Sequence, residues 1–477
     1  MELREYADCD ATALAALIRR REVTADEVYA TALEAIRLVD AEINAVAAGP
    51  WEQPLEYAED GPFAGVPFVV KDLVIHAAGV PSIMATRLSG DGIVADEDTF
   101  AMKQFRAAGF ATAALTTAPE FGFGPTTVSL RHGATRNPWD VTRSAGGSTG
   151  GTGALVGARA VPVGHANDGG GSIRVPASWN GLVGLKPSRG RVSFGPDMQE
   201  DLFGFVVEFA LTRTLRDAAA MLDAVAGSLP GDPFLVRRPD RPWIEEVGAD
   251  PGPLRIALTT DSWSERPTDP EVVATVEAVG RTLEGLGHHV EVASPAFDWE
   301  RFVTAVTKAT VLDVGYGVQE VAAASGLEPG PDTVEHVTLD AYRRRTEVTA
   351  IDVMEIKATL NDMSRLVGSF LGGYDVLVTP TINVPAPPVE FMSLNDPKYD
   401  TDSWMRELFS YASFTPMFNA TGTPALGLPL GMSAAGLPIG VQFAAPMCDE
   451  ATLLRLGSQL EQALPWADRR PAVDAGR

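Results

Sequence analysis

The chain has 477 residues, with 63 acidic and 38 basic side chains and a formal net charge of −25. Because phosphate backbones bind clustered lysine and arginine side chains, this balance argues against a nucleic-acid-binding protein. Hydrophobic residues make up 45% of the chain, which is enough for a large buried core. The two cysteines form no CxxC pair and the six histidines form no HExxH pattern, so we expect neither a disulfide framework nor a metal site.

The start of the chain and its least polar stretch carry no export or membrane signal. The first ten residues lack the basic start and the apolar run of a signal peptide. Residues 413–448 contain no charged side chain, but the five prolines among them cannot belong to one membrane-spanning helix. We therefore expect a cytoplasmic protein with no membrane segment, and a homodimer remains open.

Helices and strands alternate along the chain, judged by the spacing of apolar residues and by turn signals. A Thr-x-x-Glu capping box at Thr24 and Glu27 and a left-handed cap at Gly109 mark two helix ends. The expected elements, in chain order, are helices at 10–20 and 24–38, a strand at 65–74, a helix at 97–108, a strand at 111–116, a helix at 152–160, a strand at 161–168, a helix at 205–227, a connector at 229–254, a strand at 254–260, a helix at 269–286, strands at 288–293, 375–381, 425–430 and 438–445, and a helix at 449–463. This alternation predicts an α/β architecture around one large sheet.

Three residues within this pattern are candidates for chemistry. Lys71 lies inside the apolar strand at 65–74, Ser148 lies in the loop GGSTGG, and Ser172 follows three glycines in DGGGSIR. Each alone has an ordinary explanation. A lysine in a strand usually extends its ammonium group to solvent, a glycine-rich loop is usually a tight connection, and a serine at a strand-to-helix junction is usually a helix N-cap. Together they match the needs of a serine nucleophile, whose hydroxyl must lose a proton to a base. A lysine buried among valines and leucines can serve, because burial disfavours its ammonium form and lowers its pKa.

The glycines before Ser172 suit an oxyanion hole. Without Cβ atoms, Gly169, Gly170 and Gly171 let backbone amides converge on one point. Such donors stabilise the tetrahedral intermediate of acyl transfer by ~3–4 kcal/mol each. The loop GGSTGG lacks the Gly-Lys-Ser/Thr ending of a phosphate loop, and no GxGxxG fits a strand-to-helix turn, so we expect no nucleotide cofactor.

These segments resemble the amidase signature family of serine hydrolases. The resemblance rests on VKDL around Lys71, GGSTGG at 146–151 and DGGGSIRVPAS at 168–178, and it returns in FNATGTPALGLPLGMSAAGLPIGVQFAA near the end of the chain. It implies the amidase signature fold, with a large mixed central β-sheet flanked by helices on both faces. The implied single domain divides into N-terminal helices at 1–60, a catalytic core at 61–228, a variable substrate-shaping region at 229–412, and C-terminal strands and a helix at 413–477.

The resemblance also implies roles for the candidate residues. Ser172 would be the nucleophile, Lys71 the base, and Ser148 the serine that bridges them, held in a cis peptide after Gly147. The backbone amides of Gly169–Gly171 and of Ser172 would form the oxyanion hole. The substrate would be a small linear or cyclic amide, with carbamates and esters left open, and no cofactor is implied.

Other positions match the family less directly. Asp168 and Arg174 stand at family positions that support the loop rather than the chemistry. Thr149 replaces the second serine that the family usually has, which keeps a hydroxyl and adds a methyl group. Leu115–Thr117 stands where the family often has Lys-Thr-Asn, so the lysine and asparagine of that position are missing.

Three other interpretations remain open. GGSTG also fits the GxSxG nucleophile elbow of α/β-hydrolases, but residues 139–145 do not supply the buried strand that this elbow needs. An amidotransferase subunit that feeds ammonia to misacylated tRNA shares the motifs, but the acidity and the divergent segment at 196–215 weigh against it. A non-catalytic binding protein would not need the three candidate residues together. We therefore expect a stand-alone amidase, and we expect Trp404 and its aromatic neighbours to lie in the core rather than in the pocket.

Overall fold

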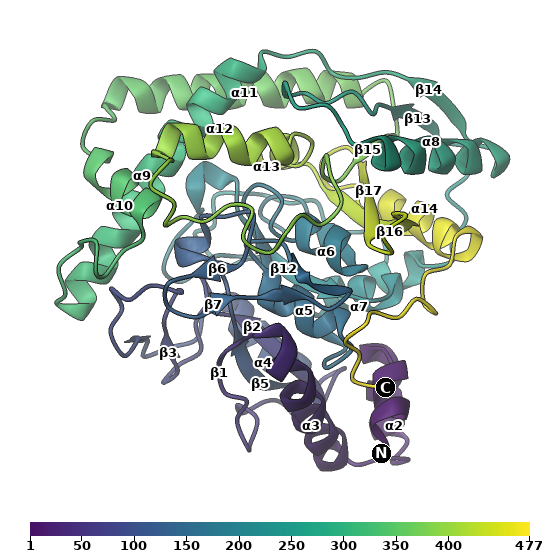
Figure 1. Ribbon diagram of the computed structural model, residues 1–477. Helices are drawn as coiled ribbons and strands as arrows, with labels where there is room; N and C mark the ends of the chain where they lie inside the picture. Colours follow the sequence, from purple (N-terminus) through teal and green to yellow (C-terminus); the bar gives the residue numbers. More distant parts are fainter.

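The computed structural model describes residues 1–477, and its centre is an eight-stranded mixed sheet (Figure 1). From one edge to the other, the strands are β10 (Val163–Asp168), β12 (Val207–Thr212), β11 (Val183–Lys186), β16 (Ala425–Met432), β17 (Pro438–Ala444), β15 (Val376–Pro380), β13 (Arg255–Leu258) and β14 (His289–Val292). Strand β13 runs parallel to both of its neighbours, and the other pairs are antiparallel. The predicted large mixed sheet is therefore confirmed.

Helices cover both faces of this sheet. Leu426 and Gly427 are neighbours on β16, and successive side chains of a strand point to opposite faces. Leu426 packs against α14 (Glu450–Ala463), whereas the open side of Gly427 faces Arg174 in α6 (Arg174–Asn180). The two helices therefore lie on opposite sides of the strand. Further helices that pack on the sheets are α5 (Gly150–Gly157), α7 (Leu215–Val225) and α8 (Pro270–Gly285).

A separate three-stranded sheet carries the lysine. Its order is β1 (Val46–Ala48), β5 (Phe110–Thr116) and β2 (Val66–Lys71), with β2 buried over its whole length. Strand β2 lies against β10, but the two form no backbone ladder, and at the end of β2 the amide of Lys71 donates to Nδ1 of His165 at 3.3 Å. The sequence predicted the strand and did not show that it lies outside the large sheet.

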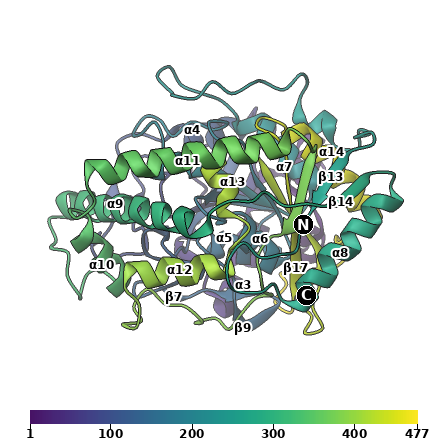
Figure 2. The same cartoon turned by 90° about the horizontal axis from the view of Figure 1, so that it is seen from above.

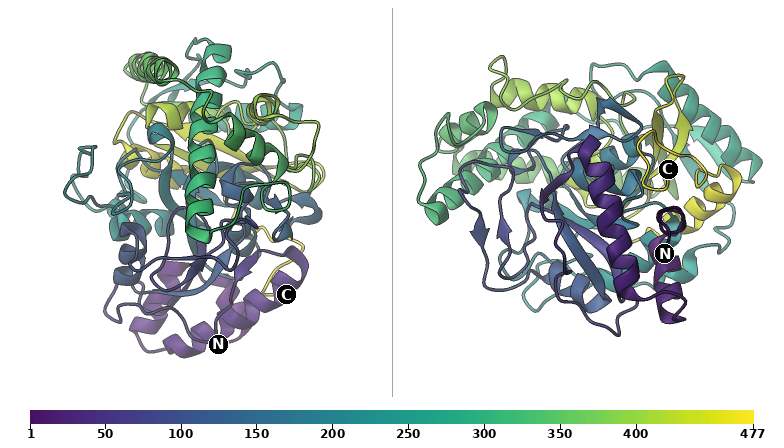
Figure 3. Two further views of the ribbon diagram at one scale, coloured as in Figure 1. Left: turned by 90° about the vertical axis from the view of Figure 1, so that its left-hand side faces the viewer. Right: turned by 60° about the horizontal axis from the view of Figure 1, so that its bottom comes forward.

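The N-terminal helices pack on this small sheet and on one another. They are α1 (Leu3–Asp8), α2 (Ala11–Arg19), α3 (Ala25–Ile43) and α4 (Phe100–Ala108). The capping box of Thr24 and Glu27 is present, and Gly109 ends α4 with a φ of 92°, so both predicted caps are confirmed. Figure 3 shows the two chain termini close together at this end of the molecule.

A layer of long helices lies at the opposite end of the molecule (Figures 1 and 2). It consists of α9 (Trp299–Ser325), α10 (His336–Arg344), α11 (Ala350–Leu371) and α12 (Thr401–Tyr411). Helix α9 contacts each of the other three. The side chains of Asp298, Thr349 and Asp400 cap the first turns of α9, α11 and α12. These helices supply one wall of the cavity described below.

The predicted helix at 205–227 is wrong in its first half. Residues Val207–Thr212 form β12, and the helix α7 begins only after Thr214, whose hydroxyl accepts a hydrogen bond from the amide of Asp217. A short, continuous apolar run fits a buried strand as well as a buried helix, so the spacing of its apolar residues does not distinguish the two structures. The uncharged stretch 413–448 forms β16, β17 and the short helix α13 (Pro416–Thr421). None of the helices combines the length and the hydropathy that a membrane-spanning helix needs.

Short elements complete the chain. They are β3 (Pro81–Ser82), β4 (Ile93–Val94), β6 (Val128–Ser129), β7 (Gly133–Ala134), β8 (Arg136–Asn137), β9 (Asp140–Ser144) and the 3-10 turns η1 (Glu120–Gly122), η2 (Leu202–Gly204) and η3 (Trp243–Glu246).

Candidate active site

Lys71 ends β2 with its side chain fully buried, as the sequence predicts. Its Nζ atom lies 2.7 Å from Oγ of Ser148 and 2.5 Å from Oδ1 of Asn167. Burial lowers the pKa of Lys71 to about 7, against the opposing charges of Glu208 and Asp168. Near neutral pH a large share of the molecules therefore holds an uncharged amine in contact with a serine hydroxyl.

Three buried polar residues of β10 and β12 hold the lysine in place. His165 accepts the backbone N–H of Lys71 through Nδ1, and its Nε2 lies 2.5 Å from Oε2 of Glu208. Asn167 donates through Nδ2 to Oε1 of the same Glu208 at 3.3 Å, which turns its Oδ1 towards the lysine. Asn167 and Glu208 are not among the site residues predicted from the sequence. A glutamate inside the apolar run FVVEFAL is the signal that could have found the second of them.

The loop that carries Ser148 is tightly packed. The peptide between Gly147 and Ser148 is cis, as the family resemblance implies. A Cβ atom on Gly147 would lie 2.5 Å from the carbonyl oxygen of Gly124, so the loop admits no side chain there. The hydroxyl of Thr127 forms hydrogen bonds to the backbone on both sides of Ser148. These contacts fix the serine hydroxyl beside Lys71.

The positions that depart from the family pattern have structural partners here. Thr149 precedes α5 and donates its hydroxyl to the carbonyl oxygen of Asn167 at 3.3 Å. Thr117, directly after β5, stands in place of the family's asparagine, and its carbonyl oxygen accepts the amide of Gly151 in α5 at 3.2 Å. Both contacts join the glycine-rich loop and its helix to the adjacent strands.

Ser172 lies in the turn between β10 and α6, and it is partly exposed. The backbone amides of Gly169, Gly170 and Ser172 have no acceptor within the chain. The amide of Gly171 instead donates to Oδ1 of Asp168 at 2.7 Å. Gly171 has a φ of 136°, a left-handed value that favours glycine. The structure thus leaves three of the four expected amides free to bind an oxyanion, and Gly171 shapes the turn.

A fully buried ion pair holds this turn. Nη2 of Arg174 lies 2.8 Å from Oδ1 of Asp168, and its Nε lies 2.9 Å from Oδ2. Nδ2 of Asn419 donates to the same carboxylate at 2.8 Å. Burial acts to raise the pKa of Asp168, but the charge of Arg174 and these hydrogen bonds outweigh it and hold that pKa well below its usual range. Asp168 is therefore an ionised anchor for the backbone.

Ser148 and Ser172 both open into one cavity of about 570 Å³. Lys71 lies behind Ser148 and does not line the cavity, and the Ser172 hydroxyl has no hydrogen-bond partner within the chain. Trp404 is fully buried, donates to the carbonyl oxygen of Phe123 at 3.1 Å and lies outside the cavity, as predicted. Its aromatic neighbour Phe123 lines the cavity, so the prediction is wrong for that residue. The wall from α9 and α12 includes Val306, Thr310, Asp313, Val314, Met405 and Phe409.

The geometry does not fit the nucleophile elbow. Residues Asp140–Ser144 form β9, but this partly exposed strand pairs with β8 in a two-stranded ribbon and otherwise forms only a single bridge, between Arg143 and Pro388. The elbow requires a buried strand directly before its serine. His165 faces Glu208 and does not line the cavity, so no histidine stands beside either serine.

Burial of a lysine is not by itself the mark of a base. Lys186 at the end of β11 is as fully buried as Lys71, and burial together with the charge of Arg174 lowers its pKa as well. Its Nζ atom donates to the carbonyl oxygen of Pro187 at 2.9 Å and meets no serine. What distinguishes Lys71 is its contact with Ser148, which opens into the cavity.

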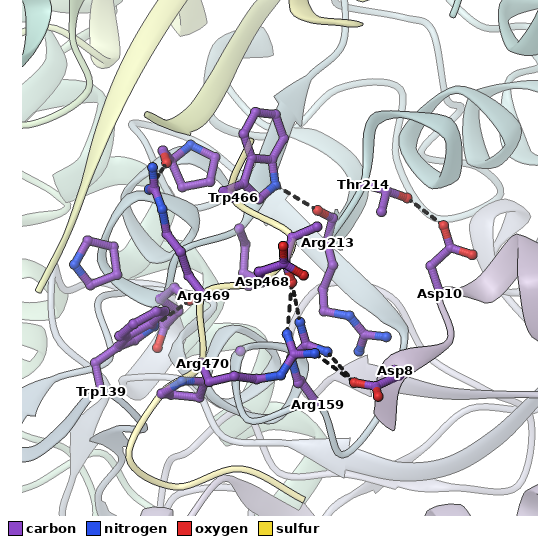
Figure 4. A pocket seen from close by; sticks show the side chains of 18 of the residues that line it. Asp8, Asp10, Trp139, Arg159, Arg213, Thr214, Trp466, Asp468, Arg469 and Arg470 are labelled. Carbon is purple, nitrogen blue, oxygen red and sulfur yellow. Dashed lines mark hydrogen bonds and ion pairs between the residues drawn. The ribbon is translucent and has the colours of Figure 1, made fainter. Parts of the chain in front are cut away.

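A second pocket, of about 420 Å³, lies where the two terminal segments meet (Figure 4). Arg159 donates to the carbonyl oxygens of Ala7 at 3.1 Å and Ala467 at 2.8 Å, and Arg470 pairs with Asp8 at 2.7 Å. No serine, lysine or histidine lines this arginine pocket, whose guanidinium groups tie both ends of the chain together. Its arginines are Arg159, Arg213, Arg216, Arg469 and Arg470.

Comparison with known proteins adds an independent finding. The amidase family model matches residues 15–454. The 6-aminohexanoate-cyclic-dimer hydrolase of Paenarthrobacter ureafaciens is 36% identical, over 97% of this chain and 96% of that protein.

Solved structures agree with this match. A structure of 6-aminohexanoate cyclic dimer hydrolase in complex with substrate has a TM-score of 0.92 and 34% identity, and the match covers 98% of this chain and 99% of that one. A bacterial aryl acylamidase of the amidase signature family has a TM-score of 0.82 at 22% identity, with 98% of each chain covered. That second likeness shows the fold alone.

Proposed function

The chain belongs to the amidase signature family of hydrolases, which act on carbon–nitrogen bonds, and from that premise we propose that it hydrolyses a small amide through an acyl-enzyme on Ser172. One observation carries the proposal. A lysine with a pKa of about 7 touches Ser148 at 2.7 Å, and Ser148 shares a cavity with Ser172, beside three unpartnered backbone amides.

Acylation begins when Oγ of Ser172 attacks the amide carbonyl carbon. Its proton passes through the hydroxyl of Ser148 to the neutral Nζ of Lys71. The negative charge that forms on the carbonyl oxygen is bound by the amides of Gly169, Gly170 and Ser172. When the intermediate collapses, the carbon–nitrogen bond breaks, and the proton returns from the lysine through Ser148 to the leaving amine.

Deacylation repeats these steps with water. Water attacks the acyl carbon and passes a proton through Ser148 to Lys71, and the carbon–oxygen bond to Ser172 then breaks. The proton returns to Oγ of Ser172, so the free enzyme is restored. Asn167 and Glu208 have no direct part in bond breaking and orient the lysine throughout.

The cavity favours a substrate with an aliphatic or otherwise apolar body. Most of its wall from α9 and α12 is apolar, and the related hydrolase is named for the cyclic dimer of 6-aminohexanoate. We place linear and cyclic aliphatic amides first, ahead of carbamates and esters.

The proposal is tested by labelling and by a substrate panel. A fluorophosphonate or sulfonyl fluoride should label Ser172, and Ser172→Ala protein should be unlabelled and inactive. A panel of lactams, aliphatic amides, anilides, carbamates and esters should show turnover of at least one amide. Labelling of Ser148 with Ser172 untouched would contradict the assignment of the nucleophile.

A further inference from the structure

Every charged side chain that lines the cavity of the two serines is acidic. Asp197 and Glu320 are exposed, whereas Asp201 and Asp313 are set deeper in the wall. No lysine, arginine or histidine lines this cavity, although five arginines line the pocket between the chain ends. The catalytic cavity is therefore electrostatically suited to a cation.

Asp201 and Asp313 form a pair of carboxyl groups without a cationic partner. Asp201 immediately precedes η2 and Asp313 lies on α9, and both side chains line the cavity, close enough for each to affect the pKa of the other. Neither is in an ion pair. Burial raises the pKa of both, to about 6 for Asp313, and for Asp201 the charge of Asp313 adds to this effect. Two neighbouring carboxylates repel each other, which favours the binding of a shared proton while no cation is present.

An ammonium group can take the place of that shared proton. It donates hydrogen bonds to both carboxylates and removes their mutual repulsion, and charge-assisted hydrogen bonds of this kind are strong. An anionic group at the same place would be repelled. The apolar side chains of Val306, Val314 and Phe409 line the same cavity and suit an aliphatic chain between the cation and the reacting carbonyl.

The pair also lies within electrostatic reach of the base. The charge of Asp201 acts to raise the pKa of Lys71, against the effect of burial. A bound ammonium group neutralises that charge and so favours the neutral amine that accepts a proton from Ser148. Binding of a cationic substrate therefore increases the fraction of Lys71 that is neutral and able to accept a proton.

We infer that Asp201 and Asp313 select amide substrates that carry an ammonium group a short aliphatic chain away from the scissile carbonyl. This inference rests on the proposed amide hydrolysis at Ser172. The two carboxyls are specificity determinants in this account and take no part in proton transfer to the reacting atoms.

The test uses pairs of p-nitroanilides in which an ammonium group replaces a terminal methyl group: 3-aminopropanoyl against butanoyl, and 5-aminopentanoyl against hexanoyl. For at least one pair, kcat/KM should be at least about tenfold higher for the ammonium member. The preference should grow from pH 5 to pH 7, as the pair loses its shared proton.

Two variants and a control locate the preference. Asp201→Asn and Asp313→Asn keep the size of the side chain, and each should bring the ratio of kcat/KM values towards one. Asp362→Asn removes a carboxylate from an exposed ion pair with Arg301 on the far side of α9, at 2.8 Å, and should leave the ratio unchanged.

Binding without turnover separates this inference from the proposed function. Ser172→Ala protein should bind 5-aminopentanamide more tightly than hexanamide in calorimetry, and adding Asp313→Asn should abolish the difference. Failure to hydrolyse any anilide or amide, with this difference in binding intact, would contradict the proposed function and support the carboxyl pair. Equal kcat/KM and equal Kd within each pair, or a preference that survives both substitutions, would overturn the inference.

Discussion

The two main pockets of this molecule differ in what their polar groups bind. In the arginine pocket, guanidinium groups donate to main-chain carbonyls and carboxylates of the two chain ends. In the serine cavity, three backbone amides and the hydroxyl of Ser172 have no partner, and a carboxyl pair has no cation. Because these groups line a cavity and have no partner within the chain, a ligand that enters the cavity can complete their hydrogen bonds.

The largest expected effect separates the two pockets most clearly. Ser172→Ala should lower kcat/KM on amides by at least ~10⁴-fold, because it removes the proposed nucleophile. The melting temperature should stay within about 2 °C, since the hydroxyl makes no hydrogen bond in the resting structure. Steady-state kinetics and calorimetric unfolding measure the two quantities. An amidase activity above about one hundredth of the original would place the nucleophile elsewhere.

Substitution of Lys71 should follow, and its effect should depend on the leaving group. Lys71→Ala should lower amide hydrolysis by ~10²–10⁴-fold, the usual contribution of a general acid–base group. Activated esters should lose less, because their leaving groups depart without a proton. Lys71→Arg should not restore amide hydrolysis, since a guanidinium stays protonated at any working pH. Near-original amidase activity in Lys71→Arg would show that the base is another group.

A substitution in the arginine pocket should have the opposite effect to Ser172→Ala, lowering stability and leaving kcat/KM nearly unchanged. Arg159→Ala removes donors to Ala7 and Ala467 and should lower the free energy of unfolding by about 2–3 kcal/mol. Its kcat/KM should stay within about twofold of the original, because surface and support residues away from the site act mainly on stability. Thermal unfolding and kinetics on one preparation provide the comparison. A large loss of kcat/KM at unchanged stability would mean that this pocket takes part in catalysis.

The smallest expected effect is that of a chelator. No group of three potential ligands among histidine, cysteine, aspartate and glutamate side chains gathers in the chain. Dialysis against EDTA should therefore leave kcat/KM unchanged. A loss of activity that added zinc or another divalent ion restores would contradict the mechanism through Lys71 and Ser148.

Much of the reacting centre could be predicted because its signals are local. Lys71 is surrounded by apolar neighbours in the sequence, so its burial could be deduced from one short segment. The glycines around Ser148 and before Ser172 are likewise consecutive, and they predict close backbone packing. Family resemblance then supplied the order of the three residues and the cis peptide.

The rest depends on contacts between segments that are distant in the chain. Asp201 and Asp313 meet only because η2 packs against α9, and nothing in either local sequence indicates the other. Asn167 becomes a partner of Lys71 only when β10 lies beside β2. The amide of Gly171 donates to the side chain of Asp168 and is therefore not available to the proposed oxyanion hole, a geometric detail that glycine spacing does not encode.

The pH dependence of kcat/KM on a neutral aliphatic amide tests the central claim most directly. The base must be neutral to accept a proton, and its pKa of about 7 lies below the usual lysine value, so activity should rise as the pH increases through about 7 and then level off. The apparent pKa of this rise belongs to the coupled lysine–serine unit rather than to Lys71 alone. The rise should persist in His165→Gln protein. A profile with no rise between pH 5 and 9, or a rise that disappears in His165→Gln, would contradict the assignment of Lys71 as the base.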